Sequence, residues 1–198
     1  FLKLKPKIDE VIICADSGIK LAMELPYKAK KLFLIGDLDS VSKTERLWCE
    51  KNAVPILKYP ENKDFTDGDL ALQYACSKYS QENQKIILGG LSSLLDHTFG
   101  NIFSAVPFVQ NGHTISFSAK KQKIYFVKEN IVLNHCKGHT LSLFPLVPSF
   151  IQSTKGLQWK IQKEEILPYQ SRTLRNKALE QKIEVEIKQG LILVIESW

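Results

Sequence analysis

The stretch LFLIGDLDS, residues 32–40, predicts the fold of the first half of the chain. It joins a short aliphatic run to a glycine and then to two aspartates. Short aliphatic runs of this kind are typical of strands buried in a parallel sheet, and ligands bind beyond the carboxyl ends of such strands. The stretch therefore predicts a buried strand that delivers polar side chains to a ligand site.

The same pattern continues on both sides of this stretch. Three further aliphatic runs lie at residues 11–14, 55–58 and 86–88. Helices are expected between the runs, two of them opened by capping-box spacings at residues 42–45 and 66–69, and a third over residues 96–105. Alternation of strands and helices predicts an α/β domain with a parallel sheet over residues 1–107.

The character of the sequence changes after Pro107. Apolar residues then recur with period two, at residues 114–117, 123–127, 130–133, 140–144, 182–187 and 191–195. The short glycine-bearing segment 188–190 is interpreted as the turn of a hairpin between the last two strands. We therefore expect an antiparallel all-β domain, a sandwich or barrel, over residues 108–198.

Composition limits the class of protein. The chain has 198 residues and a net charge of +6, and its lysines are dispersed along the sequence. No basic stripe interleaved with aromatic residues is present, so we expect no nucleic-acid partner. No apolar run reaches about eighteen residues and the first residues form no signal-peptide core, so we expect no membrane partner and a cytoplasmic protein.

The cysteines and most histidines carry no recognisable motif. No C-x-x-C pair occurs, and the cysteines are expected to be reduced, buried thiols instead of zinc ligands or disulfides: Cys14, Cys49, Cys76 and Cys136. Three histidines lie near the predicted β strands without an acidic partner in a motif, and no role is assigned to them: His113, His135 and His139.

Aspartates follow the predicted parallel strands. They are Asp16, Asp37, Asp39, Asp64, Asp67 and Asp96. Each could be a turn residue or a helix cap, and a structural acidic rim is the alternative interpretation of the whole set. Carboxylates gathered at one edge repel one another unless a cation lies between them, and with phosphate co-ligands that cation is typically Mg²⁺. The spacing therefore favours Mg²⁺-dependent phosphate chemistry.

Two pairs of these aspartates have informative spacing. Asp37 and Asp39 project to the same side if the backbone is extended. Asp64 and Asp67 are three residues apart at a predicted helix start, where they share one face. That helix end also attracts phosphate, and Lys63 adds a nearby positive charge.

Five segments of the chain match the pattern of a known family: ADSG at 15–18, IGDLDS at 35–40, KDFTD at 63–67, LDH at 95–97 with Asn101, and TKGLQW at 154–159. By the order and approximate spacing of these segments, the sequence resembles thiamine pyrophosphokinases along nearly all of its length. The resemblance implies a homodimer that transfers pyrophosphate from ATP to the hydroxyl of thiamine and releases AMP.

The resemblance also implies roles for individual residues. The catalytic aspartates are Asp37, Asp39, Asp64 and Asp67, of which Asp37, Asp39 and Asp67 hold Mg²⁺. ATP is placed by Lys63, Thr66, Asp96 and His97. Thiamine is bound by Asp16, Trp159 and Asn176.

The chain departs from the family pattern in two places. Ser92, Ser93 and Leu94 stand where the family has two glycines and an arginine, and Arg175 precedes Asn176 where the family has serine. Leucine cannot clamp a phosphate as arginine does. Two alternatives therefore stay open: a binding protein with impaired transfer, and a Mg²⁺-dependent phosphohydrolase.

Overall fold

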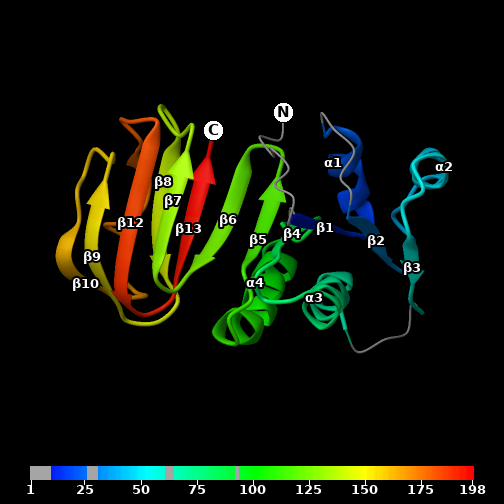
Figure 1. Cartoon of the computed structure of the whole chain (residues 1–198), viewed down its shortest axis with the longest axis horizontal. Helices are drawn as coiled ribbons and strands as arrows, with labels where there is room; N and C mark the ends of the chain where they lie inside the picture. The colour runs from blue at the N-terminus through cyan, green and yellow to red at the C-terminus, as the bar shows by residue number, and fades with distance from the viewer. Residues whose placement is uncertain (1–9, 26–30, 61–64, 92–93) are drawn as a thin grey trace. The chain divides into compact units, whose positions relative to one another are not determined.

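The computed structural model describes residues 10–25, 31–60, 65–91 and 94–198 (Figure 1). Contacts within the chain divide it into two compact units, Phe1–Lys120 and Lys121–Trp198. Within the described ranges, the structure contains no helix that is long and apolar enough to cross a membrane.

The first unit is built on a parallel sheet. Its strands are β1 (Glu10–Ala15), β2 (Leu32–Gly36), β3 (Ile56–Lys58), β4 (Gln84–Leu88) and β5 (Ile115–Ala119). They are ordered β5-β4-β1-β2-β3, and each neighbouring pair is parallel. The predicted α/β class with a parallel sheet is confirmed.

Helices connect these strands. They are α1 (Ile19–Met23), which follows a single 3-10 turn at Asp16–Gly18, α2 (Lys43–Lys51), α3 (Asp67–Lys78) and α4 (Leu95–Gln110). Both predicted capping boxes form, with Ser42 and Thr66 as the N-caps of α2 and α3. Figure 1 draws α3 beside α4, and the two helices are in contact.

Alternate residues of the central strands bury both faces of the sheet. Ile12 and Leu34 belong to a core cluster that also includes residues of α1 and α2. Ile13 and Ile35 point to the opposite face and are fully buried. Helix α3 contacts β1, β2 and β4. Burial on both faces explains why these strands are aliphatic throughout.

The division between the units lies further along the chain than the sequence suggested. The expected boundary at Pro107 falls inside α4, which continues to Gln110. Strand β5, expected to begin the all-β domain, instead pairs in parallel with β4, with Ile87 opposite Phe117. Its period-two pattern arises from its own geometry and does not reveal whether its neighbour is parallel.

The second unit is an antiparallel sandwich. Its strands are β6 (Gln122–Val127), β7 (Asn130–Asn134), β8 (Thr140–Pro145), β9 (Ser149–Lys155), β10 (Gln162–Ile166), β11 (Asn176–Lys177), β12 (Lys182–Gln189) and β13 (Ile192–Ser197). One layer has the order β11-β8-β13-β6 and the other β10-β9-β12-β7. Side chains from both layers, including Leu143, Ile151, Val185 and Val194, form one core. The predicted all-β class is confirmed.

The predicted hairpin at residues 188–190 is wrong. β12 pairs with β7 and β9, whereas β13 pairs with β6 and β8, so the two strands lie in different layers. Ile187 and Ile192 both face the core between the layers. Gly190, with φ of 113°, turns the chain from one layer to the other, and a Cβ there would stand 2.2 Å from Ser149 Oγ.

Candidate active site

The carboxyl ends of β1 and β2 bring Asp16 and Asp37 to one edge of the sheet. The two strands are parallel, with Ala15 opposite Ile35. Asp16 directly follows β1, and Asp37 directly follows Gly36 at the end of β2. The pairing of β1 with β2 therefore brings both aspartates to the same edge of the sheet, because parallel neighbours have their carboxyl ends on the same side.

Gly36 allows the backbone to pass close to the carboxylates. Its φ of 151° lies in a region that side chains rarely adopt. A Cβ here would stand 3.1 Å from Cγ of Asp67 and 3.4 Å from Cβ of Asp16. A glycine is needed at this position for both its conformation and the space that it leaves.

Helix α3 supplies the third carboxylate. Asp67 is its first residue and Thr66 its N-cap. The Thr66 hydroxyl accepts a hydrogen bond from Asp69 N at 3.1 Å, and the Asp69 carboxylate accepts one from Thr66 N at 3.1 Å. This capping box fixes where the helix starts and thus where Asp67 lies, and the positive end of the helix dipole lies at the same place.

Asp16, Asp37 and Asp67 form a compact carboxylate group. Each offers one oxygen, and these oxygens all lie within 4.8 Å of one another, with all three residues partly buried. The Ser40 hydroxyl donates a hydrogen bond to Asp16 Oδ2, and the backbone N of Asp39 donates one to Asp37 Oδ1 at 3.1 Å. The Asp39 carboxylate is exposed and lies outside this group.

The group has the properties expected of a divalent-metal site. Asp16 Oδ1 is buried and has no hydrogen-bond partner among the residues that the structure describes. A buried carboxylate oxygen normally has a partner, and a cation would supply one. Three oxygen ligands of this kind suit a hard cation such as Mg²⁺, which leaves its other positions to water or phosphate.

The electrostatics of Asp16 support the same interpretation. Burial raises the pKa of its carboxyl, the hydrogen bond from Ser40 lowers it, and the neighbouring charges of Asp67, Asp39 and Asp37 raise it further. Repulsion among like charges is therefore built into this edge of the sheet. A divalent cation removes that repulsion and favours the ionised form of all three carboxylates.

Two supports of the site were not anticipated from the sequence. Arg46 on α2 donates from Nη2 to Leu38 O at 2.7 Å and from Nε to Val41 O at 3.2 Å, which holds the loop after β2. Ser40 holds Asp16. Ser40 belongs to the GDLDS stretch, but no spacing signal pointed to its partner 24 residues away.

Asp96 and His97 lie in the first turn of α4, and both are exposed. The backbone N of His97 donates to Asp96 Oδ1 at 2.8 Å. Leu94 is the N-cap residue of the helix and is 55% exposed. The structure places these residues at one helix end and not within the carboxylate group.

Trp159 and Asn176 lie together in the second unit. The backbone N of Trp159 donates to Asn176 Oδ1 at 3.1 Å, and Asn176 Nδ2 donates to Trp159 O at 2.6 Å. Asn176 is buried, whereas Trp159 is 60% exposed. Asn176 therefore holds the segment from which the Trp159 side chain projects.

Four residues of the sequence interpretation lie outside the described residues. They are Lys63, Asp64, Ser92 and Ser93. Thr66 lies within the described residues, and its hydroxyl serves the capping box and also contacts Asn101 Oδ1 at 3.4 Å.

A parallel α/β unit with a carboxylate group and a helix N-terminus at its carboxyl edge is an arrangement typical of metal-dependent, phosphate-handling proteins. A family model described as the catalytic domain of thiamin pyrophosphokinase matches residues 4–117. The chain belongs to the thiamin pyrophosphokinase family.

Relatives agree with this assignment. The thiamine pyrophosphokinase of Bacillus subtilis (strain 168) is 42% identical over 87 residues, which cover 44% of this chain but only 35% of that relative. A solved thiamine pyrophosphokinase from Bacillus subtilis has a TM-score of 0.74 at 21% identity, covering 97% of this chain and 89% of the other. The yeast enzyme has a TM-score of 0.64 at 14% identity, covering 99% and 88%. At such identities the structures establish a shared fold.

Proposed function

We propose that the protein transfers a pyrophosphoryl group from Mg²⁺-bound ATP to the hydroxyl of thiamine, forming thiamine diphosphate and AMP. The observation that carries the proposal is the group of Asp16, Asp37 and Asp67 beside the N-terminus of α3, with a buried Asp16 oxygen in need of a partner. Membership of the thiamin pyrophosphokinase family supplies the acceptor and the reaction type.

Asp37 and Asp67 would hold the Mg²⁺ ion, and Asp16 would share it. The ion, when bound, neutralises the negative charge of the phosphates. Asp39 lies close enough to raise the pKa of Asp16, and we keep it as a ligand that joins when phosphates are present. Asp64 would add a further carboxylate to the site.

The proposed transfer has a simple balance of bonds. The thiamine oxygen bonds to the β-phosphorus, and the bond from that phosphorus to the oxygen shared with the α-phosphate breaks. AMP leaves with the electron pair of that bond. The hydroxyl proton passes to one of the clustered aspartates, which lie where the reacting groups are expected.

Individual residues are assigned to each of the two substrates. We assign the nucleotide to Lys63, Thr66, Asp96 and His97, and the exposed first turn of α4 is accessible for such a contact. The exposed face of Trp159 suits the cationic thiazolium ring, since aromatic faces attract cations. Asn176 contributes by holding the backbone of Trp159.

The test is direct measurement of AMP and thiamine diphosphate formed from ATP, Mg²⁺ and thiamine, with each component omitted in turn. We expect both products in equal amounts, dependent on thiamine and on the metal. Tight binding of thiamine or ATP without AMP release would instead identify a binding protein. Hydrolysis of ATP without thiamine would identify a phosphohydrolase.

We also propose that the protein is a homodimer. Leu95, Phe99 and Phe103 recur at intervals of four on α4 and are 72%, 51% and 58% exposed. The rings of Phe99 and Phe103 stack with centroids 6.5 Å apart. Contiguous exposed apolar rows of this kind are typical of surfaces that bind another protein chain.

Replacing Phe103 with glutamate is expected to shift the protein from dimer to monomer, because a charge placed in the apolar row must be desolvated on association. Light scattering during size-exclusion chromatography measures the mass. The matched control is Leu47→Glu on α2, where Leu47 is 54% exposed; it should leave the mass unchanged. A dimer that survives the Phe103 change would place the interface elsewhere.

We also propose that the protein is cytoplasmic. The four cysteines are buried thiols without a disulfide among the described residues, which is typical of a reducing compartment. The expectation that neither nucleic acid nor a membrane is a partner stays a prediction.

A further inference from the structure

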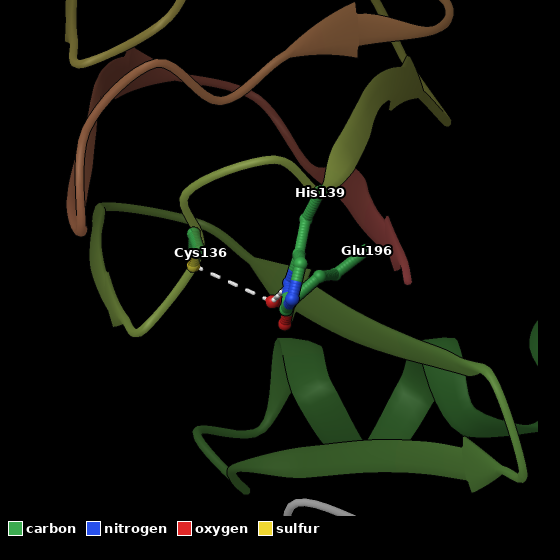
Figure 2. A group of neighbouring side chains, drawn as sticks. All are labelled: Cys136, His139 and Glu196. Carbon is green, nitrogen blue, oxygen red and sulfur yellow. Dashed lines mark hydrogen bonds and ion pairs between the residues drawn. The ribbon is translucent and has the colours of Figure 1, made fainter.

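The second unit gathers a cysteine, a histidine and a glutamate that the sequence keeps far apart. Figure 2 shows the side chains of Cys136, His139 and Glu196 pointing toward one another. Their ligand atoms all lie within 4.8 Å of each other. The three residues are only 0%, 7% and 6% exposed, respectively. Zn²⁺ accepts sulfur, nitrogen and oxygen ligands of these three kinds.

The backbone fixes the position of the cysteine and the histidine. Both lie in the turn between β7 and β8, where His139 N donates to Cys136 O at 2.8 Å. The turn is tied to the neighbouring chain, since Cys136 N donates to Gln181 O at 3.0 Å and Gly138 N to Ala178 O at 2.9 Å. The two ligands are therefore held before any ion binds, which reduces the entropy lost on binding.

Glu196 enters the cluster from the core face of β13. It follows Val194 by two residues, so both side chains lie on the same face, and Val194 belongs to the apolar core of the sandwich. A carboxylate on such a face is unfavourable unless charged or polar groups satisfy it. The Glu196 carboxylate is therefore stabilised at the core by the polar groups of His139 and Tyr125 that contact it.

The distances are close to those that a zinc ion requires. Tetrahedral ligands at the usual Zn²⁺ bond lengths stand about 3.3 Å apart for nitrogen and oxygen and about 3.6 Å apart for sulfur and oxygen. Here His139 Nδ1 lies 2.6 Å and Cys136 Sγ 3.4 Å from the same Glu196 Oε1. For the ion to enter, His139 Nδ1 and Glu196 Oε1 would have to move apart by about 0.7 Å.

The charges balance when a divalent ion is bound. A Cys136 thiolate and a Glu196 carboxylate carry two negative charges, His139 ligates as neutral imidazole, and the ion carries two positive charges. The sum is zero, which suits a buried position. Binding releases the thiol proton of Cys136 to solvent, because the thiolate is the metal ligand, and the hydrogen between His139 Nδ1 and Glu196 Oε1 moves to His139 Nε2, which keeps the ring neutral.

Neighbouring groups orient these ligands. Tyr125 donates its hydroxyl hydrogen to the second oxygen of Glu196, Oε2, at 3.1 Å. The ring of Trp198 stacks on that of His139 with centroids 5.7 Å apart. Hydrogen-bonded carboxylates and fixed imidazole rings are characteristic surroundings of bound metals.

We propose that Cys136, His139 and Glu196 form a zinc site in the second unit, separate from the carboxylate group of the first. The three side chains supply three tetrahedral positions, and water or another ligand takes the fourth. The site stabilises the end of the sandwich where β7, β8 and β13 meet. The competing interpretation is a metal-free hydrogen-bonded cluster.

The test uses the full chain, stripped of metal with a chelator under reducing conditions and titrated with Co²⁺. We expect a thiolate-to-cobalt absorption band that saturates at one equivalent and disappears when Zn²⁺ is added. We also expect Zn²⁺ to raise the unfolding temperature, because an ion that binds the folded state stabilises it. Absence of the cobalt band in the folded wild-type protein would overturn the proposal.

Variants connect the signal to these residues. Cys136→Ser should abolish the thiolate band, and His139→Gln should weaken Co²⁺ affinity by at least about 100-fold, more than typical losses from outer-shell changes. Cys76→Ser is the control, since burial raises the pKa of the Cys76 thiol to about 11 and Cys76 lies on α3 of the first unit. A band that survived Cys136→Ser or vanished in Cys76→Ser would contradict the assignment.

Discussion

Asp37→Asn and Asp67→Asn are each expected to lower kcat/KM for thiamine diphosphate formation by about 10²- to 10³-fold. Each change removes one negative charge from the group of three carboxylates that we propose to hold Mg²⁺. Metal-ion stabilisation of phosphoryl transfer contributes several kcal/mol, and each 1.4 kcal/mol corresponds to a tenfold change in rate. The measurement is steady-state kinetics at several Mg²⁺ concentrations.

The controls separate ligand loss from general damage. Glu50→Gln on α2 removes a charge from an exposed residue of the same unit and should leave kcat/KM within about twofold of the wild-type value. Asp39→Asn should have a smaller effect than Asp37→Asn, because the Asp39 carboxylate lies outside the group of three. Full Mg²⁺-dependent turnover in the Asp37 and Asp67 variants would show that the metal lies elsewhere.

Gly18→Ala is expected to lower the free energy of unfolding by about 3 kcal/mol, at the upper end of overpacking effects. Gly18 has ordinary helical dihedrals, φ −56° and ψ −20°, so conformation does not demand glycine here. A Cβ, however, would stand 2.2 Å from Leu88 O and 2.8 Å from Gly89 N. Backbone atoms of a buried strand end cannot move aside, so the chain that carries Asp16 must shift.

Gly100→Ala provides the matched comparison. Gly100 lies inside α4, and a Cβ there would have no neighbour within 4 Å. Alanine is favoured over glycine in a helix by about 1 kcal/mol, so the free energy of unfolding should rise slightly. Denaturant unfolding followed by circular dichroism measures both variants. Equal stabilities of the two variants would refute the steric argument at Gly18.

Local signals in the sequence were enough to predict the first unit. The aliphatic runs became β1 to β4, and the spacings after Ser42 and Thr66 became capping boxes, because both features depend on neighbours within a few residues. The boundary between the two units and the connection at residues 188–190 depend instead on which distant strands pair with β5, β12 and β13. Period-two apolarity in β5, β12 and β13 was visible, but it does not identify that partner.

The second unit also contained strands that were not anticipated. β10 (Gln162–Ile166) has the sequence QKEEI and buries only its last residue, and β9 (Ser149–Lys155) has few apolar side chains. β10 lies at the edge of its layer, where it pairs with one strand only and its polar side chains can remain in water. Such a strand leaves little hydrophobic pattern in the sequence.

The carboxylate group was predicted in part. Asp37, Asp39 and Asp67 were predicted to hold the metal and Asp16 to bind thiamine, whereas the structure groups Asp16 with Asp37 and Asp67 and leaves Asp39 outside. Asp16 joins the other two because β1 and β2 pair with Ala15 opposite Ile35, a register that no local pattern specifies. The Cys136, His139 and Glu196 cluster was missed for the same reason, since 57 residues separate His139 from Glu196.

The register of β1 against β2 has a consequence for the folding of the first unit. Backbone hydrogen bonds between these strands hold Asp16 and Asp37 at a separation that their own charges oppose. The stability of the unit and its affinity for the proposed cation would therefore be coupled, because the sheet holds the charges together in the ion-free protein and a bound cation would stabilise the paired strands. With a substitution that weakens the pairing of β1 and β2, the folded fraction would then depend on the concentration of divalent ions.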